Sequence, residues 1–233
     1  MIRIDKLHFA WPRDRADCLN IESLTVPAGR TVFLYGPSGS GKSTLLGLLA
    51  GVLLPREGRV ELLGQDWAAL PSHQRDARRA DHVGYIFQQF NLLPYLDALG
   101  NALLPCRFSK RRHERAAAAA GTASAAAQSL LQRVGLAEAL WHRPAGALSV
   151  GQQQRVAAAR ALIGSPEVVI ADEPTSALDT ELRDAFMRLL LGECRAAGSA
   201  LVFVSHDRQL AAQFDAQWSL ADINRATPST TAA

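Results

Sequence analysis

The sequence has few of the features that mark secreted or membrane-spanning proteins. Its 233 residues include only three cysteines, Cys18, Cys106 and Cys194, which lie far apart and show neither a disulfide framework nor a metal-binding spacing. The longest apolar stretch, residues 45–54, is interrupted by glycine and is far shorter than the roughly 20 residues that span a membrane. We therefore expect a protein of a reducing compartment that does not cross a membrane unaided.

The sequence also lacks a strong charge of one sign. Lysine and arginine number 25 and aspartate and glutamate 22, which gives a net charge of +3. This excess is too small to indicate nucleic-acid binding, so we expect no nucleic-acid partner. Hydrophobic residues make up 48% of the chain, which is enough for the core of a globular protein.

One glycine-rich stretch carries the strongest pattern. An apolar run at 32–35 predicts a buried strand, and the leucine-rich run 45–49 predicts a helix. Between them, residues 36–43 read GPSGSGKS, which fits the phosphate-binding pattern GxxxxGK followed by serine or threonine. The predicted ATP-binding residues here are Gly36, Pro37, Ser38, Gly39, Ser40, Gly41, Lys42, Ser43 and Thr44. Among them, Lys42 would reach the β- and γ-phosphates, and Ser43 would hold Mg²⁺.

Three further predicted strands end in polar residues. Gln88, the pair Asp172 and Glu173, and His206 each follow an apolar run. Because ligands of open parallel sheets bind at the carboxyl ends of the strands, one fold can bring all of them to one nucleotide. Asp172 is the candidate Mg²⁺ ligand, and Glu173 is the candidate general base for the water that attacks the γ-phosphate. A helix cap is the alternative for this pair.

The segment 97–166 differs in character from its surroundings. Residues 110–134 are rich in alanine and predict helix, with a low-complexity linker as the alternative. We expect a helical subdomain inserted into an α/β core that consists of residues 1–96 and 167–222. A flexible tail is expected at 223–233, where threonine, serine and alanine dominate.

Several motifs together resemble those of the nucleotide-binding subunit of an ABC transporter. Residues 148–155, LSVGQQQR, resemble its signature motif, and residues 168–179, VVIADEPTSALD, resemble its Walker B motif and D-loop. Gln88 matches the Q-loop glutamine, His206 the switch histidine and Trp11 the aromatic residue that stacks on adenine. The resemblance implies an α/β P-loop NTPase of the ABC type, with a mixed sheet core, N-terminal antiparallel strands and an inserted α-helical subdomain.

The resemblance also implies roles for individual residues, with ATP and Mg²⁺ as ligands. The implied catalytic residues are Glu173, His206, Gln88 and Lys42. The implied metal ligands are Ser43, Gln88 and Asp172. The signature residues, expected to act on the ATP of another subunit, are Ser149, Val150, Gly151 and Gln152. Asp179 would act across that dimer interface, and Trp11 would stack on adenine unless it is a surface aromatic.

Within the family, the stretches IFQQFNLLPYL and LSVGQQQRVAAARAL resemble the branch of lipoprotein-release, macrolide-export and cell-division ATPases. This implies a homodimer or paired ATPase subunit that drives an integral membrane permease from the cytoplasmic face of the membrane. The alternatives are a soluble ABC ATPase of DNA repair or translation, and an ATP-driven regulator that gates a partner without transport.

Three features depart from the family pattern or stay open. Val150 replaces the first signature glycine, and we expect it at negative φ because a β-branched residue is an outlier at positive φ. Residues 92–95 are either core or part of a groove for a partner's helix. Past His206 the chain stops sooner than family members usually do.

Overall fold

A five-stranded parallel sheet forms the centre of the molecule, with the strand order β6, β7, β8, β3, β9. These strands span Val83–Ile86, Val168–Asp172, Ala200–Val204, Thr31–Tyr35 and Ala216–Ser219. The computed structural model describes residues 1–12, 16–176, 178 and 180–226. Asp179 of the expected D-loop, and the end of the expected tail from residue 227, lie outside the described residues.

The N-terminal strands form a sheet of their own. Its antiparallel order is β2, β1, β4, β5. These strands span Leu19–Val26, Ile2–Phe9, Glu57–Leu62 and Gln65–Asp66. Buried Ile2 and Ile4 alternate with exposed or half-buried neighbours, and a register shift between Asp5 and His8 interrupts the pattern. The predicted α/β fold with N-terminal antiparallel strands is thus confirmed, and the structure resolves its core into two sheets.

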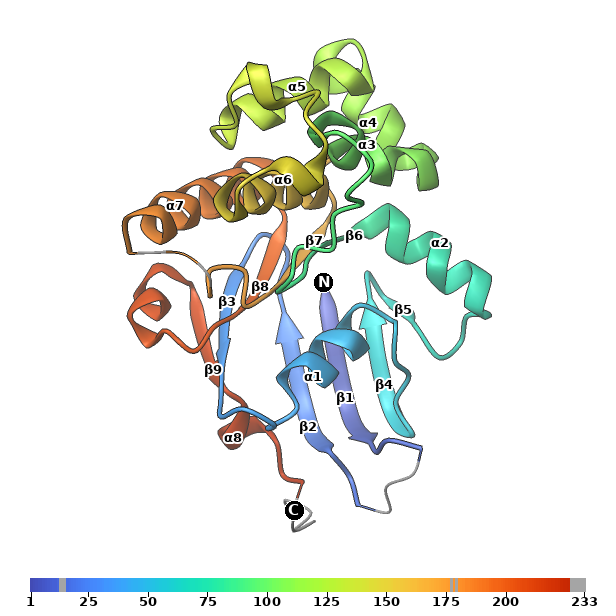
Figure 1. The fold of residues 1–233 in the computed structure, drawn as a ribbon. Helices are drawn as coiled ribbons and strands as arrows, with labels where there is room; N and C mark the ends of the chain where they lie inside the picture. The colour runs from blue at the N-terminus through green and yellow to red at the C-terminus, as the bar shows by residue number, and fades with distance from the viewer. Residues whose placement is uncertain (13–15, 177, 179, 227–233) are drawn as a thin grey trace.

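Helix α1 (Lys42–Leu49) lies between the two sheets, and Figure 1 shows it in front of the antiparallel strands β2 and β1. Four of its leucines are at most 1% exposed, and they pack in one cluster with residues of both sheets. The four leucines lie on both sides of the helix, and both sides are covered by the sheets. The glycine-rich stretch 36–41 therefore leads into a well-packed helix.

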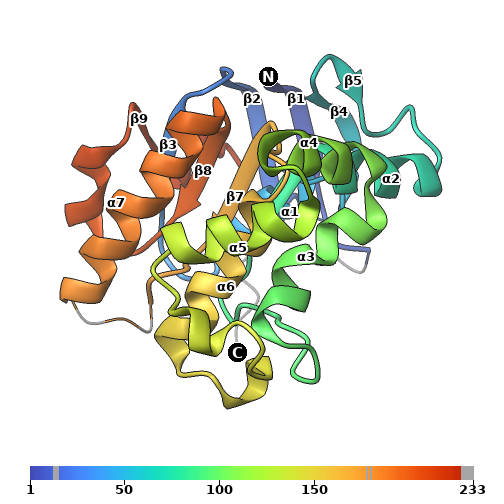
Figure 2. The ribbon, with the colours of Figure 1, turned by 90° about the horizontal axis from the view of Figure 1, so that it is seen from above.

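The opposite face of the parallel sheet carries the helical layer. Helices α6 (Val150–Leu162) and α7 (Thr180–Ala197) cover the sheet, and α3, α4 and α5 gather beyond them (Figures 1 and 2). These last three helices span Ala98–Phe108, Lys110–Ala120 and Ala123–Arg133. All of them except α7 lie between β6 and β7 in the sequence. The alanine-rich segment is thus helix, as predicted, and not a linker.

The ends of these helices carry the side-chain caps that their sequences supply. Asp97 accepts a hydrogen bond from Gly100 N–H, and Thr122 accepts one from Ala125 N–H. Gly121, between α4 and α5, has φ +82°. Two further α-helices are α2 (Ser72–His82), which has no buried residue, and α8 (Leu220–Ile223). Within the described residues, short 3₁₀ helices lie at Glu138–Leu140, Ala145–Ala147 and Arg208–Gln213. No helix within the described residues is both long and apolar enough to cross a membrane.

The expectation of a flexible tail from residue 223 is wrong for its first residues. Ile223 ends α8, and Asn224 then binds β2, because its Oδ1 accepts from Asn20 N–H at 2.8 Å. The N–H of Arg225 in turn donates to the carbonyl of Asn20 at 2.8 Å. Composition gave no sign of this anchoring, because it depends on the N–H and the carbonyl of Asn20, which lies 204 residues before Asn224.

The contact between β6 and α6 yields a stability prediction. A Cβ added to Gly84 of β6 would lie 2.1 Å from the carbonyl oxygen of Ala161 in α6. Backbone at this contact cannot move aside cheaply, so we expect Gly84→Ala to lower the free energy of unfolding by about 3 kcal/mol.

The matched control is Gly192→Ala in α7, where an added Cβ meets no atom within 4 Å. This change should be neutral or should raise stability by up to about 1 kcal/mol, because alanine favours helix. Urea denaturation of both variants measures the difference. Equal effects of the two substitutions would contradict the tight approach of β6 and α6.

Candidate nucleotide-binding site

The carboxyl ends of β3, β7 and β8 meet at one edge of the parallel sheet. The register pairs Val204 of β8 with both Leu34 of β3 and Asp172 of β7. The chain following each strand therefore starts from neighbouring positions, and the N–H of Glu173 donates to the carbonyl of Val204 at 3.0 Å. This edge holds the glycine loop, Asp172, Glu173 and His206, the residues that the sequence expects around one nucleotide.

The glycine loop, residues 36–41, curls over the start of α1. Gly41 has φ +100°, a left-handed conformation that favours glycine. Lys42 follows it and is only 7% exposed. Its ammonium group donates to the carbonyls of Gly36 and Pro37, both at 2.9 Å. A charged donor held over the loop in this way can exchange carbonyl oxygens for phosphate oxygens.

Two further features of the loop fit a phosphate group. Among the described residues, the hydroxyl oxygen of Ser40 is buried without a hydrogen-bond partner. Buried polar atoms seldom lack a partner, and a phosphate oxygen or its hydration would supply one. At the adjacent Gly39, a Cβ would meet no atom within 4 Å, so the loop is open on that side.

Asp172 and Ser43 form the part of the site that fits Mg²⁺. The Ser43 hydroxyl lies close enough to the Asp172 carboxylate to affect its ionisation. Burial raises the pKa of Asp172, as does the charge of Glu173, while the Ser43 hydrogen bond and the charge of Lys42 act in the opposite direction. A partly desolvated carboxylate beside a hydroxyl oxygen suits a hard cation that keeps several waters and binds phosphate as well.

Glu173 is held in an unusual conformation that directs it to His206. Its φ of +46° is rare for a residue other than glycine, and such strain is common at functional sites. The carboxylate Oε1 lies 2.6 Å from Nε2 of His206. The Glu173 side chain is 16% exposed and that of His206 is 48% exposed, so the pair lies at the boundary between sheet and solvent.

The backbone around His206 is fixed by contacts that the sequence did not reveal. Asp207 pairs with Arg183 of α7 through one carboxylate oxygen and accepts from Gln209 N–H through the other. Its own N–H donates to the hydroxyl of Ser205 at 3.1 Å. Because Arg183 and Asp207 are 24 residues apart, no local pattern predicts their pairing.

Gln88 and Trp11 lie at the periphery in this structure. Gln88 follows β6 and is exposed. Trp11 is 43% exposed and packs against Phe9 in a T-shaped arrangement, with ring centroids 5.3 Å apart. This exposure suits a residue that stacks on adenine and equally suits a surface aromatic. Both assignments stay predictions.

The signature residues lie on the helical layer and not at the glycine loop. Ser149 caps α6, and its side chain and that of Gln152 bond to each other's backbone N–H. Val150 begins the helix and is absent from the positive-φ residues, as predicted. It is 49% exposed, and a Cβ at Gly151 would meet no atom within 4 Å. Figure 1 places α6 among the helices, away from the turn between β3 and α1.

Buried polar side chains tie the signature helix to the nucleotide site. The amide of Gln154, 2% exposed, donates to the carbonyl of Pro174 at 2.8 Å, one residue past Glu173. Arg160 donates to the carbonyls of Phe90 and Asn91, just past Gln88. Sequence reasoning missed both links. The one available signal was a charged residue inside the otherwise small and apolar run 156–163.

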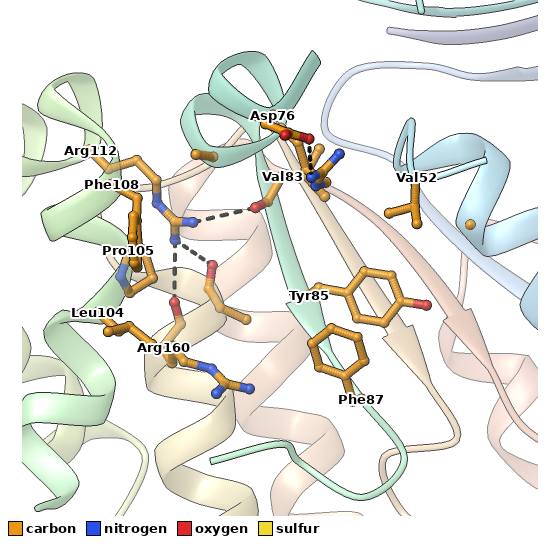
Figure 3. A pocket seen from close by; sticks show the side chains of 14 residues that line it. Val52, Asp76, Val83, Tyr85, Phe87, Leu104, Pro105, Phe108, Arg112 and Arg160 are labelled. Atoms are coloured by element: carbon orange, nitrogen blue, oxygen red, sulfur yellow. Dashed lines mark hydrogen bonds and ion pairs between the residues drawn. The ribbon is translucent and has the colours of Figure 1, made fainter. Parts of the chain in front are cut away.

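A groove of about 470 Å³ lies beside the chain that leads to Gln88 (Figure 3). Its apolar lining includes Val52, Val83, Tyr85, Phe87, Leu104, Pro105 and Phe108. Arg112 lies at its wall, 2% exposed, and donates to the carbonyls of Ala161 and Ile163 at 2.7 Å each. Burial lowers the pKa of Arg112 to about 10.

Residues 92–95 do not line this groove. Leu92 packs against the core, the backbone of Leu93 bonds to Asn101, and Tyr95 is 75% exposed. Of the two alternatives left open by the sequence, core packing thus holds for Leu92. A groove does exist close by, but the residues around Phe87 form it instead.

Known proteins resemble this chain over most of its length. The sequence pattern of the ABC transporter family matches residues 19–176. An ABC transporter ATP-binding protein of Escherichia coli K12, YbbA, is 46% identical over 192 residues, which are 82% of this chain and 81% of that protein. The macrolide export ATP-binding/permease protein MacB of Chromobacterium violaceum is 42% identical over 204 residues. The match covers 86% of this chain but only 30% of that relative's length.

Solved structures give the same result. The dimeric post-hydrolysis state of the ATP-binding cassette MJ0796, bound to ADP and Pi, has a TM-score of 0.81 and 32% identity to this chain. The likeness covers 97% of this chain and 98% of that one. The chain therefore belongs to the ABC transporter family and is an ATP-binding cassette that hydrolyses ATP.

Proposed function

We propose that the catalytic residues of this ATPase are those gathered at the carboxyl edge of the parallel sheet. The observation that carries the proposal is the 2.6 Å contact between Glu173, which directly follows Asp172 at the end of β7, and His206, which comes after the neighbouring strand β8. Glu173 acts as the general base that takes the proton of the attacking water. His206 holds the Glu173 carboxylate and reaches toward the terminal phosphate.

The glycine loop binds the phosphates through its backbone N–H groups and Lys42. Ser43, Asp172 and Gln88 are the residues that would hold Mg²⁺. When bound, the ion neutralises phosphate charge and orients the terminal phosphate. Trp11 would stack on adenine.

The signature motif completes the site of another subunit in this proposal. Ser149, Val150 and Gly151 are accessible on α6, and the helix N-terminus that they form suits an anion. Within one chain they have no phosphate to bind. The related cassette MJ0796 is described as a dimer. We propose a homodimer, or a pair with a second ATPase subunit, in which each ATP lies between the glycine loop of one chain and the signature of the other.

The proposed partner beyond this dimer is an integral membrane permease of the lipoprotein-release or macrolide-export type. Relatives are named as macrolide export and syringafactin export ATP-binding/permease proteins, in which the two functions share one chain. The groove beside Phe87 offers exposed apolar side chains to a partner helix, with Phe108 74% exposed and Val52 62% exposed. The protein would then work at the cytoplasmic face of the membrane, held there by its permease.

The role of Glu173 is tested by Glu173→Gln. This variant should bind MgATP but hydrolyse it at least tens of times more slowly, because a positioned base contributes about 10²–10⁴-fold. The matched control is Glu181→Gln, an exposed residue of the first turn of α7, which should keep normal turnover. Phosphate release and calorimetric ATP binding measure the two properties. Near-normal turnover of Glu173→Gln with intact binding would place the base elsewhere.

The two-subunit site is tested by mixing variants. Lys42→Ala spoils a site through one chain and Ser149→Arg through the other, so each homodimer has two defective sites. With random exchange in a two-fold dimer, about half of the dimers are mixed, and roughly one site in four keeps an intact Lys42 facing an intact Ser149. Mixing the two variants should therefore restore occluded ATP in roughly one site in four. If mass measurement verifies mixed dimers and ATP occlusion does not recover, the glycine loop and the signature of different chains do not share a site.

The docking groove is tested by a matched pair of exposed aromatics. Phe108 of the groove is 74% exposed and Tyr95 outside it is 75% exposed, so aspartate at either position should be tolerated by the fold. Phe108→Asp should sharply reduce the fraction of the protein that sediments with membranes of the cells that produce it naturally, whereas Tyr95→Asp should not. The opposite result would move the docking surface to residues 92–95. Binding to protein-free liposomes would point instead to the basic start of α4.

A further inference from the structure

Residues 220–225, the C-terminal segment, lie against the first residue of the glycine loop. Strand β9 pairs with β3 so that Ser219 lies opposite Tyr35, which puts Leu220 beside Gly36. A Cβ added to Gly36 would lie 3.3 Å from the Cβ of Leu220, which is fully buried. Figure 1 shows α8 next to the stretch of chain that joins β3 to α1. The C-terminal segment therefore contacts one end of the loop.

The same segment is bonded to the start of β2. The Oδ1 of Asn224 accepts from Asn20 N–H at 2.8 Å, and its Nδ2 donates to the carbonyl of Cys18 at 3.1 Å. The N–H of Arg225 donates to the carbonyl of Asn20 at 2.8 Å. Because β2 is at the edge of its sheet, the C-terminal segment takes the place of a neighbouring strand there. These bonds fix the backbone on both sides of residue 19.

Leu19, which lies between these bonds, contacts the other end of the glycine loop. A Cβ added to Gly41 would lie 3.0 Å from Cδ2 of Leu19 and 3.4 Å from the sulfur of Cys18. Leu19 is fully buried, so its side chain has no room to turn away from Gly41. The C-terminal segment thus contacts the first residue of the loop, Gly36, and is bonded to the strand that contacts the last, Gly41.

The contacts within the loop are weak or must change when phosphate binds. Gly39 and Gly41 have positive φ, and glycine resists rotation of the backbone less than any other residue. The N–H of Ser40 reaches the carbonyl of Pro37 only at 3.3 Å. The bonds from the Lys42 ammonium group to loop carbonyls would be exchanged for bonds to phosphate. The contacts at the two ends of the loop are apolar, so phosphate does not compete for them.

We propose that Asn224 is a positioning residue for the glycine loop. By fixing β2 at Asn20, it holds Leu19 against Gly41 and keeps the N–H groups of the loop directed at the phosphates. The inference rests on the proposed role of the loop as the phosphate site. If the loop without this support is correctly placed in about a tenth to a third of the molecules, nucleotide affinity falls by about three- to tenfold.

The first experiment measures nucleotide affinity by calorimetry, with MgADP and with the magnesium complex of the non-hydrolysable analogue AMP-PNP. Asn224→Ala should weaken both by the same factor of about three to ten, because both nucleotides place phosphates in the loop. Phosphate release at saturating ATP should stay within about twofold of the wild type, since bound nucleotide restores the placement of the loop. A loss of kcat with unchanged affinity would overturn the inference.

The matched control is Thr122→Ala at the N-terminus of α5. Thr122 also accepts a hydrogen bond from a backbone N–H, that of Ala125 at 3.0 Å, but it belongs to the helical layer. Both substitutions should lower the urea concentration at the midpoint of unfolding, and only Asn224→Ala should weaken nucleotide binding. If Thr122→Ala weakens binding equally, affinity follows global stability and Asn224 has no positioning role.

Lys42→Ala separates this inference from the proposal on which it rests. It should weaken the binding of both nucleotides, because Lys42 is proposed to contact phosphate directly. If Lys42→Ala does so and Asn224→Ala binds as the wild type does, the loop is the phosphate site and the inference about Asn224 is wrong. If Lys42→Ala also binds as the wild type does, the loop is not the phosphate site and both proposals fail.

The second experiment needs no substitution and measures amide hydrogen exchange by NMR. The N–H groups of Arg225 and Ala226 report on the C-terminal segment, because they bond to the carbonyl of Asn20 at 2.8 Å and to Oδ1 of Asn224 at 3.0 Å. Coupling between two sites is reciprocal, so MgADP should slow the exchange of these two amides by about three- to tenfold, together with that of the loop. Protection of the loop alone would show that the two are not coupled and would overturn the inference.

Discussion

The register of three parallel strands is the constraint on which the rest of the structure depends. Val204 of β8 lies between Leu34 of β3 and Asp172 of β7, so the three chains leave the sheet side by side. A slip of one residue would turn every side chain of a strand to the other face. The glycine loop, the Asp172 carboxylate and the contact between Glu173 and His206 all follow from this one alignment.

The helical layer is joined to this edge by polar side chains that are themselves buried. Gln154 and Arg160, both on the signature helix, donate to backbone carbonyls just past Glu173 and Gln88. Leaving a buried guanidinium or amide unpaired costs about 1–3 kcal/mol or more, so these links resist sliding of the two layers. These bonds are a physical path by which a change at the N-terminus of α6 can reach Glu173, the proposed base. The groove beside Phe87 lies next to the segment that Arg160 holds.

Much of this was predictable from sequence because it depends on local patterns. The strand, glycine loop and helix at residues 32–49 were predicted because the apolar runs and the loop glycines have a recognisable spacing, and the helices around Gly121 were predicted because alanine favours helix. The negative φ of Val150 also followed from its branched side chain, because a β-branched residue is an outlier at positive φ. The contacts that could not be predicted join distant segments: Arg183 with Asp207, Asn224 with Asn20, and Gln154 with Pro174. Each depends on the register of elements, which no single stretch encodes.

The central claim is that one chain supplies half of each ATP site. The most direct measurement is the distance between spin labels on two different chains, one labelled at Ser38→Cys in the glycine loop and the other at Val150→Cys in the signature. Both would carry Glu173→Gln to retain ATP, and Cys18, Cys106 and Cys194 would be replaced. The account predicts a short distance that appears with MgATP and is absent from samples labelled at only one of the two positions. If MgATP is bound and no such distance appears, the signature of one chain does not face the glycine loop of the other, and the account is wrong.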